Sequence, residues 1–284
     1  MRTGIVILNY NDYDTTLKML NQIKNYKILD LIVIVDNGSR DDSYKRLKKE
    51  ENDKIKVIKT DRNSGYASGN NYGLKYLSDK NIDYVIISNP DVLVSEEVIK
   101  ELKKDLETNN ISLIAPIIKE NDSISKGWEL PGFKEDLISN ITYFHKYSKK
   151  MLSYSDNYYN KKIVPVEVVH GCFFMIKYND FKEMDFFDEN TFLYYEENIL
   201  GKKLQDNNKI TAVDTTLSVI HDLSVSVDKS LNSLKKYKIL KMSQFYYEKK
   251  YNKLNIFGLF LLRLFYYISY GISFLYLLIG GSKK

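Results

Sequence analysis

The amino-terminal half of the chain alternates short apolar runs with segments of helical spacing. The apolar runs are rich in β-branched residues and show no polar alternation, so each is expected to form a strand buried on both faces. Runs of this kind lie at residues 5–8, 31–35, 55–58, 84–88 and 111–118. Between them lie helical segments, one of which is expected to begin after Ser95 and end near Thr108. The pattern predicts an α/β fold with a mostly parallel sheet flanked by helices.

Polar or glycine-containing segments follow four of these strands. They are Asn9-Tyr10, Asp36-Asn37, Asn63–Gly65 and Asn89–Asp91. The carboxyl ends of parallel strands meet at one edge of a sheet, and ligands bind there in folds of this class. We therefore expect a ligand site at this edge.

The regular alternation ends after Pro116. Residues 119–162 are polar and rich in tyrosine, and they contain Trp128, the single tryptophan. The later predicted elements are two strands that could pair with each other at 164–169 and 170–176, a helix at 194–205, and short strands at 210–213 and 217–220. This organisation predicts one domain over residues 1–225 and a separate carboxy-terminal helical region over residues 226–284.

The carboxy-terminal region differs from the rest of the chain in charge and hydropathy. From Lys229 onward lie eleven of the 42 Lys and Arg residues and one of the 37 acids, so this tail has a net charge of +10 and the remainder −5. Residues 256–279 are nearly all apolar apart from Arg263. The combination indicates helices that bind an acidic membrane surface. A helix in the interface, a helix that spans the bilayer and a helix buried in an oligomer all stay open.

The composition narrows the class of protein. Apolar residues make up 44% of the chain and charged residues 28%, which is typical of a globular protein. The single Cys172 excludes a disulfide framework. No G-x-G-x-x-G follows the first strand and no Walker lysine motif occurs, which disfavours a dinucleotide-binding domain and a P-loop enzyme. Because the basic tail is also apolar, a membrane is favoured over a nucleic acid as its partner.

The carboxylate of Asp91 stands at the mouth of a buried strand, where it has a chemical use. Mg²⁺ and Mn²⁺ prefer carboxylate oxygens, and one or two carboxylates suffice when a diphosphate supplies the other ligands. Pro90 restrains the turn that presents Asp91. The alternative is that Asn89 and Asp91 form a turn that caps the next helix, and Asp36–Ser39 could likewise be an ordinary turn.

Four segments taken together resemble a known family. In chain order they are Val6–Asn11, Ile34–Ser39, Asn63-x-Gly65-Tyr66-Ala67-x-Gly69-Asn70-x-x-Gly73 and Asn89-Pro90-Asp91. Their order over residues 3–222 resembles the family 2 glycosyltransferases of the GT-A fold, most closely the rhamnosyltransferase-like branch. The resemblance implies transfer of rhamnose or a hexose, with inversion, from a dTDP- or UDP-sugar. It also implies a Mg²⁺ or Mn²⁺ ion and a glycan or lipid-linked acceptor in bacterial cell-surface polysaccharide synthesis.

The resemblance also implies which residues contact the donor and the metal. Nucleotide-sugar contacts are expected from Leu8, Asn9, Tyr10, Asp36, Asn37, Ser39, Asn63, Gly65, Asn70, Asn89 and Asp91. Metal ligands are expected from Asp91, which matches the last aspartate of the family's D-x-D motif, and from His221. Asn89 stands at the first position of that motif, which leaves one carboxylate where other members have two. For His221, a strand-end histidine bonded to the backbone is the alternative.

The segment Phe192–Ile199 resembles the family's E-D motif, which precedes a helix. The match places Glu197 at the position of the catalytic base, with Glu196 as the alternative base. Without the resemblance, two acids at a helix N-terminus are explained by the helix dipole. On the acceptor side, the resemblance implies contacts from Gly171 and from the loop at 119–162, where Trp128 could stack on a sugar ring.

Two rival functions stay open. A nucleotidyltransferase of similar form would need a Gly-rich, basic loop after the first strand, which residues 9–12 do not provide. A non-catalytic, membrane-bound subunit of a glycan-assembly complex would tolerate Asn89 and a glutamate at 197. The positive flanks of the tail place the expected enzyme at the cytoplasmic face of the cell membrane. No nucleic-acid partner is expected, and assembly into a homo-oligomer through the tail stays open.

Overall fold

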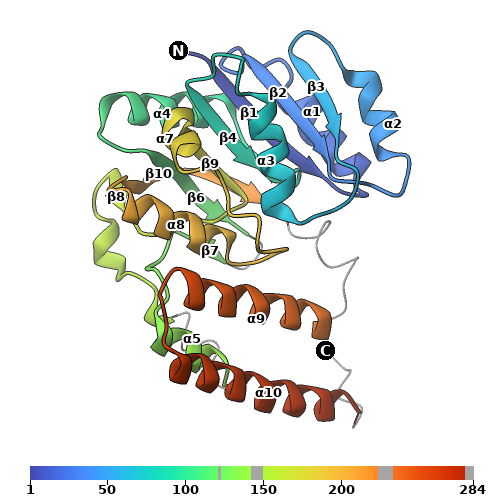
Figure 1. Ribbon diagram of the computed structural model, residues 1–284. Coiled ribbons are helices and arrows are strands. Elements are labelled where there is room, and N and C mark those ends of the chain that lie inside the picture. The colour runs from blue at the N-terminus through green and yellow to red at the C-terminus, as the bar shows by residue number, and fades with distance from the viewer. Residues whose placement is uncertain (121–122, 142–149, 223–232, 279–284) are drawn as a thin grey trace.

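The computed structural model describes residues 1–120, 123–141, 150–222 and 233–278. Within these residues lies a ten-stranded sheet with the order β3-β2-β1-β4-β9-β6-β10-β5, while β7 pairs with β6 and β8 with β10 (Figure 1). The strands are β1 Thr3–Asn9, β2 Leu31–Asp36, β3 Ile55–Lys59, β4 Tyr84–Ser88, β5 Val92–Leu93, β6 Leu113–Lys119, β7 Ile124–Ser125, β8 Ile163–Pro165, β9 Phe173–Lys177 and β10 Thr211–His221.

The first four long strands are parallel, as their apolar runs predict. β1 pairs in parallel with β2 and β4, and β2 pairs in parallel with β3. Their carboxyl ends therefore meet at one edge of the sheet. β9 enters antiparallel between β4 and β6, and β10 runs parallel to β6. The predicted α/β fold with a mostly parallel sheet is confirmed.

Two predictions about the later strands are wrong. The segments 164–169 and 170–176 do not pair with each other, because β8 ends at Pro165 and pairs with β10, whereas β9 pairs with β4 and β6. The segments 210–213 and 217–220 are parts of the single strand β10, whose register shifts between Asp214 and Ser218. Local hydrophobic periodicity does not reveal these arrangements, since it carries no information about distant partners.

Helices cover both faces of the sheet (Figure 1). Ile5 and Ile7 of β1 belong to a core shared with α1, α2 and α4, whereas Val6 belongs to a second core shared with α3, α7 and α8. This division follows from the alternation of side chains along a strand. The helices are α1 Tyr13–Ile23, α2 Ser43–Leu47, η1 Lys48–Glu50, α3 Tyr66–Tyr76, α4 Glu96–Thr108, α5 Phe133–Ser139, η3 Asp156–Tyr159, α7 Tyr178–Glu183, α8 Glu196–Asp206, α9 Ser233–Lys250 and α10 Ile256–Leu278.

The tail forms two helices, α9 and α10, which lie side by side at the end of the molecule opposite α2 (Figure 1). Asp188 fastens α9 to the body, because its carboxylate accepts hydrogen bonds from Tyr246 (2.7 Å), Lys250 (2.7 Å) and Tyr251 (2.6 Å). The helix α10 packs against α9 and α5. The predicted domain boundary at 225 lies outside the described residues and stays a prediction.

In the described part of the chain, no helix is both long and apolar enough to cross a membrane.

Candidate active site

A cavity of about 800 Å³ lies at the carboxyl ends of β1, β2, β3 and β4, and we call it the strand-end cavity. Several residues expected to bind the nucleotide sugar line it: Leu8, Tyr10, Asn37, Ser39, Asn63, Gly65 and Asn89. Gly65 has a φ of 105°, and a Cβ there would clash with the backbone of Phe192. Glycine at this position therefore lets the segment before α8 form part of the cavity wall.

Three other predicted nucleotide contacts, Asn9, Asp36 and Asn70, are fully buried and do not line this cavity. The Asn9 side-chain amide donates to Asp36 Oδ2 at 2.9 Å, and its carbonyl oxygen accepts from the Thr16 hydroxyl at 2.8 Å. Asp36 also accepts from the backbone N–H of Ser39 at 3.0 Å. In the structure these residues hold the strand ends in place, and other residues form the cavity surface.

Four cations that the sequence analysis does not single out also line the strand-end cavity: Arg40, Lys59, Arg62 and Lys235. Lys59 is the last residue of β3 and Arg62 follows that strand, so their position at the same edge of the sheet is the signal that could have found them. Lys235 belongs to α9. The hydrophobic periodicity of the first 120 residues gives no information about where this helix lies. Asp12 and Asp61 line the cavity too, so the cations outnumber the acids by two, and this excess of positive charge favours an anionic ligand such as a diphosphate.

Beside this cavity lies a cluster of acids and imidazoles. His221 Nε2 is 3.3 Å from Asp91 Oδ1, and His221 Nδ1 is 3.0 Å from Glu120 Oε1. His170 Nε2 is 3.4 Å from the same Glu120 oxygen. The predicted pair Asp91 and His221 is therefore brought together across the sheet, from the turn after β4 and the end of β10. The alternative for His221, a strand-end histidine bonded to the backbone, does not account for these contacts, because they are made to side chains.

The cluster also contains three residues to which the sequence assigns no role: Glu120, His170 and Cys172. The donor atoms of His170, Cys172 and His221 lie within 4.8 Å of one another. Glu120 directly follows β6 and His170 precedes β9, so both stand at strand ends. A position at a strand end is the feature by which both residues could have been identified. The sequence does not reveal it, because β9 inserts antiparallel between β4 and β6.

The electrostatics of the cluster favour positive charge. Burial alone lowers the pKa of His221, but its hydrogen bond to Asp91 and the nearby charges raise that pKa to about 11. The hydrogen bond from His170 outweighs burial at Glu120 and lowers the pKa of its carboxyl to about 2. The same negative surroundings would hold a divalent cation such as Mn²⁺ or Mg²⁺, which would take the place of the proton on His221, because only a neutral imidazole binds a metal.

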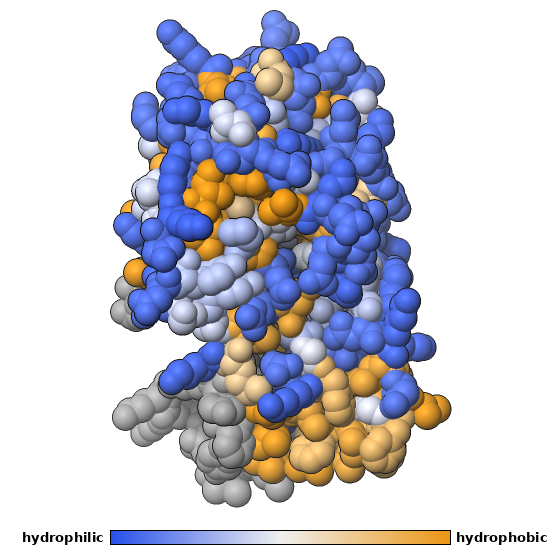
Figure 2. Space-filling view, turned by 90° about the vertical axis from the view of Figure 1, so that its left-hand side faces the viewer, coloured by the Kyte–Doolittle hydropathy of each residue, from blue (hydrophilic) through white to orange (hydrophobic). Residues whose placement is uncertain are grey.

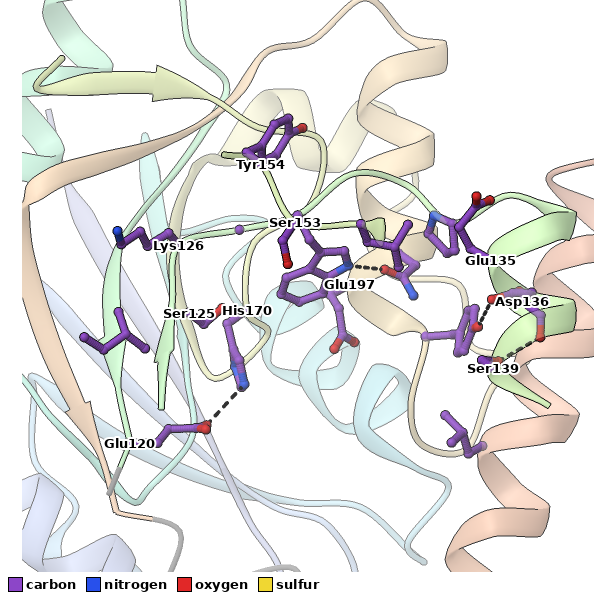
Figure 3. Close-up of a pocket in the computed structure, with 18 of the residues that line it drawn as sticks. Glu120, Ser125, Lys126, Glu135, Asp136, Ser139, Ser153, Tyr154, His170 and Glu197 are labelled. Atoms are coloured by element: carbon purple, nitrogen blue, oxygen red, sulfur yellow. Dashed lines mark hydrogen bonds and ion pairs between the residues drawn. The ribbon is translucent and has the colours of Figure 1, made fainter. Parts of the chain in front are cut away.

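A second cavity of about 640 Å³ lies on the other side of the cluster, and we call it the glutamate cavity. Glu197 points into it between the Glu120–His170 pair and the α5 residues Asp136 and Ser139 (Figure 3). Trp128 lines the same cavity, with its indole N–H donating to Asn198 at 2.9 Å. Gly171 lies beside Glu197, since a Cβ at Gly171 would be 4.0 Å from the Glu197 carboxylate.

The structure separates the two candidate bases. Glu196 is 5% exposed, and burial followed by the neighbouring charge of Glu197 raises its pKa well above the ordinary value. Glu197 lines the cavity, whereas Glu196 does not. Tyr194 and Tyr195, just before α8, both have positive φ (72° and 70°). Such backbone strain costs free energy and clusters at functional sites, and here it lies directly before the helix that carries Glu197.

The acid–imidazole cluster borders both cavities, although Asp91 and His221 themselves are buried and line neither. Asn89 and Pro90, which precede Asp91, line the strand-end cavity, whereas Glu120 and His170 line the glutamate cavity. An anionic ligand in the first cavity and a neutral, hydroxyl-bearing ligand in the second would meet at this cluster, close to Glu197.

Comparison with known proteins gives a consistent assignment. A family model for glycosyl transferase family 2 matches residues 4–184. The chain is 28% identical over 195 residues to the low-salt glycan biosynthesis hexosyltransferase Agl10 of Haloferax volcanii, a match that covers 68% of this chain and 58% of that protein. It is 24% identical over 198 residues to the uncharacterized glycosyltransferase YwdF of Bacillus subtilis, covering 69% and 65%. The chain thus spans less than two thirds of the length of either relative.

Solved structures show the same fold. S. aureus TarS 1-349 in complex with UDP-GlcNAc matches with a TM-score of 0.61 at 13% identity, covering 93% of this chain and 71% of that one. GalNAc-T7 with UDP, GalNAc and Mn²⁺ matches with a TM-score of 0.60 at 15% identity, covering 88% and 50%. At these identities the likeness concerns the fold alone, and it agrees with the GT-A-type sheet. Since the family model covers most of the chain, this protein belongs to glycosyl transferase family 2.

Proposed function

We propose that this protein is an inverting glycosyltransferase that uses a nucleotide-diphosphate sugar. The observation that carries the proposal is that two cavities border the Asp91–His221 pair: Asn89 and Pro90 line the cation-rich one, and Glu120, which contacts His221, lines the one that contains the carboxylate of Glu197. A transferase needs this arrangement, because donor and acceptor must reach one reacting centre from two sides.

The donor would occupy the strand-end cavity, with its diphosphate toward the cations and the cluster. Its base and ribose would lie near Leu8, Tyr10 and Asn37. We expect a dTDP- or UDP-sugar that carries rhamnose or a hexose. The hexosyltransferase named among the relatives and the UDP-GlcNAc complex of TarS support this class of donor.

Asp91 and His221, with Glu120 beside them, would hold a Mg²⁺ or Mn²⁺ ion. Such an ion would stabilise the negative charge of the departing nucleoside diphosphate. The single carboxylate of the Asn89-Pro90-Asp91 turn would then be supplemented by the histidine and Glu120, both of which come from other strands.

In the reaction, the acceptor hydroxyl oxygen bonds to the anomeric carbon while the bond from that carbon to the diphosphate oxygen breaks. The diphosphate leaves with the electron pair, and Glu197 takes the proton of the hydroxyl. Attack from the side opposite the leaving group inverts the anomeric centre. Trp128 and Gly171 would contact the acceptor in the glutamate cavity.

We also propose that the tail binds the cytoplasmic face of a bacterial cell membrane, where the product would enter cell-surface polysaccharide. Apolar colour gathers over the lower end of the molecule in Figure 2, where α10 lies in Figure 1. The exposed apolar residues of α10 include Phe257, Phe260, Tyr267 and Ile268, between 50% and 67% exposed. Lysines of α9 would attract acidic headgroups.

The test is an assay of the purified chain with dTDP-rhamnose, UDP-glucose or UDP-GlcNAc, MnCl₂ and a bacterial membrane-lipid extract. We expect one donor to release nucleoside diphosphate and to label an acceptor, and we expect this activity to be lost in Asp91→Asn. A nucleotidyltransferase would release pyrophosphate instead. A non-catalytic subunit would bind nucleotide without turnover.

A further inference from the structure

Three side chains of the acid–imidazole cluster form a group that we call the cysteine–histidine triad: His170, Cys172 and His221. His170 and Cys172 stand just before β9, and His221 ends β10. Cys172 is 1% exposed and His221 is 5% exposed, and one ligand atom from each of the three residues lies within 4.8 Å of the other two. Of these three residues, the proposed function uses His221 alone.

The ligand atoms of the triad differ in kind from those of the neighbouring acids. Mg²⁺ and Mn²⁺ are hard ions that favour oxygen, whereas proteins bind Zn²⁺ chiefly through imidazole nitrogen and thiolate sulfur. At a given site Zn²⁺ generally also binds more tightly than Mn²⁺. A metal ion deprotonates the thiol that coordinates it. Two imidazoles and the thiolate of Cys172 are therefore a ligand set for zinc, with a fourth position open to water.

The spacing of the triad is close to what zinc needs. At the limit of 4.8 Å, an ion midway between the three ligand atoms would lie about 2.8 Å from each, whereas zinc bonds are about 2.0 Å to nitrogen and about 2.3 Å to sulfur. Side-chain movements of roughly half an ångström to one ångström would close the site. The His170 side chain is 29% exposed and lines the glutamate cavity, which gives an ion a path to the triad.

Glu120 orients both imidazoles in the way that zinc ligands are commonly oriented. Its Oε1 is 3.4 Å from His170 Nε2, the pair drawn in Figure 3, and 3.0 Å from His221 Nδ1. If each ring donates that N–H to Glu120, the opposite nitrogens stay available to a metal ion, and a carboxylate in this position is the usual outer contact of a zinc-bound histidine. His170 Nδ1 accepts from the backbone N–H of Cys172 at 3.1 Å, and the bond to zinc would replace this hydrogen bond.

We propose that His170, Cys172 and His221 form a zinc site, and that zinc bound there excludes the Mn²⁺ or Mg²⁺ ion held by Asp91. The zinc site stands on the triad alone, whereas the exclusion rests on the proposed function. His221 Nε2 is 3.3 Å from Asp91 Oδ1, so this nitrogen would serve either ion but not both at once. Zinc would therefore inhibit the metal-dependent binding of the nucleotide.

Absorption spectroscopy with Co²⁺, a coloured substitute for Zn²⁺, tests the zinc site without any nucleotide. A thiolate bound to Co²⁺ gives an intense charge-transfer band in the near ultraviolet. Because Cys172 is the single cysteine of the chain, such a band in the wild-type protein can come from this residue alone. We expect the band to appear with one equivalent of Co²⁺ and to disappear when one equivalent of Zn²⁺ is added. A folded wild-type protein without the band would overturn the proposal.

Two variants separate the zinc site from the site at Asp91. Cys172→Ser should weaken Zn²⁺ binding, measured by calorimetry, by more than about tenfold, since even the outer contacts of a metal site contribute that much. Asp91→Asn, the matched control, should keep the cobalt band, because Asp91 is not part of the triad. Equal Zn²⁺ affinities of the wild-type protein and Cys172→Ser would place the ion on the acids and overturn the proposal. Should Cys172→Ser fail to fold, His170→Gln takes its place in the same comparison.

Nucleotide binding tests the exclusion. When UDP or dTDP binds the wild-type protein with Mn²⁺, one equivalent of Zn²⁺ should weaken that binding, and Cys172→Ser should need at least about tenfold more Zn²⁺ for the same effect. Nucleotide binding that persists at saturating Zn²⁺ would overturn the exclusion. A protein that shows the cobalt band but binds no nucleotide would overturn the proposed function and leave the zinc site standing.

Discussion

At the scale of residues, adjacent carboxylates in this site differ because their surroundings differ. Glu196 is buried, which raises the pKa of its carboxyl, whereas Glu197 faces a cavity beside Gly171. The E-D resemblance offers both as the base, and their exposure differs: Glu196 is buried, whereas Glu197 lines the cavity just after a turn in which Tyr194 and Tyr195 have positive φ. A single sequence does not reveal that turn, since nothing in two consecutive tyrosines predicts a left-handed backbone.

We predict that Glu197→Gln lowers kcat by about 10²- to 10⁴-fold, the usual contribution of a general base. The Kd for the nucleotide should stay the same, because Glu197 does not line the strand-end cavity. Glu196→Gln serves as the matched control and should change kcat little, since burial raises the pKa of Glu196 and so disfavours the charged form that a base needs. Kinetics of both variants with the identified donor provide the measurement. The opposite ranking of the two variants would assign the base to Glu196.

The buried amide of Asn9 provides a second prediction at this scale. Asn9→Ala removes the amide group that donates to Asp36 and the carbonyl oxygen that accepts from Thr16. Each buried polar group that is left unpaired costs about 1–3 kcal/mol. Urea unfolding should show a loss of stability in this range, with only a modest effect on nucleotide affinity. A large loss of affinity at unchanged stability would mean that Asn9 contacts the nucleotide directly, as the sequence suggests.

At the scale of elements, the pattern of the first half of the chain is sufficient to predict its strands and helices. β-branched runs mark β1 to β4, and Ser95 caps α4 by accepting from the N–H of Val98, as expected. The later half is less predictable, because β9 inserts antiparallel between β4 and β6 and β10 is one long, irregular strand. Tertiary contacts determine which strands pair here, and local hydrophobic periodicity carries no information about those contacts.

The contact between α5 and α9 is expected to weaken as pH rises. Burial, followed by the charge of Asp136, raises the pKa of Glu248 above its ordinary 4.5. The folded state therefore holds a proton that the unfolded state releases near pH 4.5, and this stabilisation is lost as pH rises through the folded pKa. Glu248→Gln keeps an acceptor for the Asn252 side chain, whose amide donates to Glu248 at 2.8 Å.

Melting temperatures measured from about pH 5 to about pH 9 test this expectation, because stability falls with pH wherever the folded state binds more protons. The wild-type protein should lose stability over this range more steeply than Glu248→Gln. Parallel curves for the two proteins would show that Glu248 does not titrate in the folded state at this pH. The carboxyls of Asp136 and Glu248 interact, so the replacement also changes the titration of Asp136, and the difference between the two curves reports on the pair.

At the scale of the whole molecule, the division into a −5 body and a +10 tail predicts an interaction that depends on salt. The structure places the exposed apolar side chains and the basic residues of this tail in adjacent helices. We expect binding to vesicles that contain phosphatidylglycerol, weaker binding at high salt, and a clear loss in the double variant Phe257→Ser and Phe260→Ser. Flotation with vesicles measures this. If the protein bound neutral vesicles as strongly as phosphatidylglycerol vesicles at all salt concentrations, electrostatic attraction of the tail to the membrane would be contradicted.

The central claim is that a metal-assisted diphosphate site lies between the two cavities. Calorimetric titration of UDP and dTDP into the wild-type protein and Asp91→Asn, with and without Mn²⁺, tests it most directly. The account predicts that one nucleotide binds the wild-type protein tightly only when Mn²⁺ is present, and that Asp91→Asn loses this dependence. Nucleotide binding of equal strength without Mn²⁺, or an unchanged metal dependence in the variant, would contradict it.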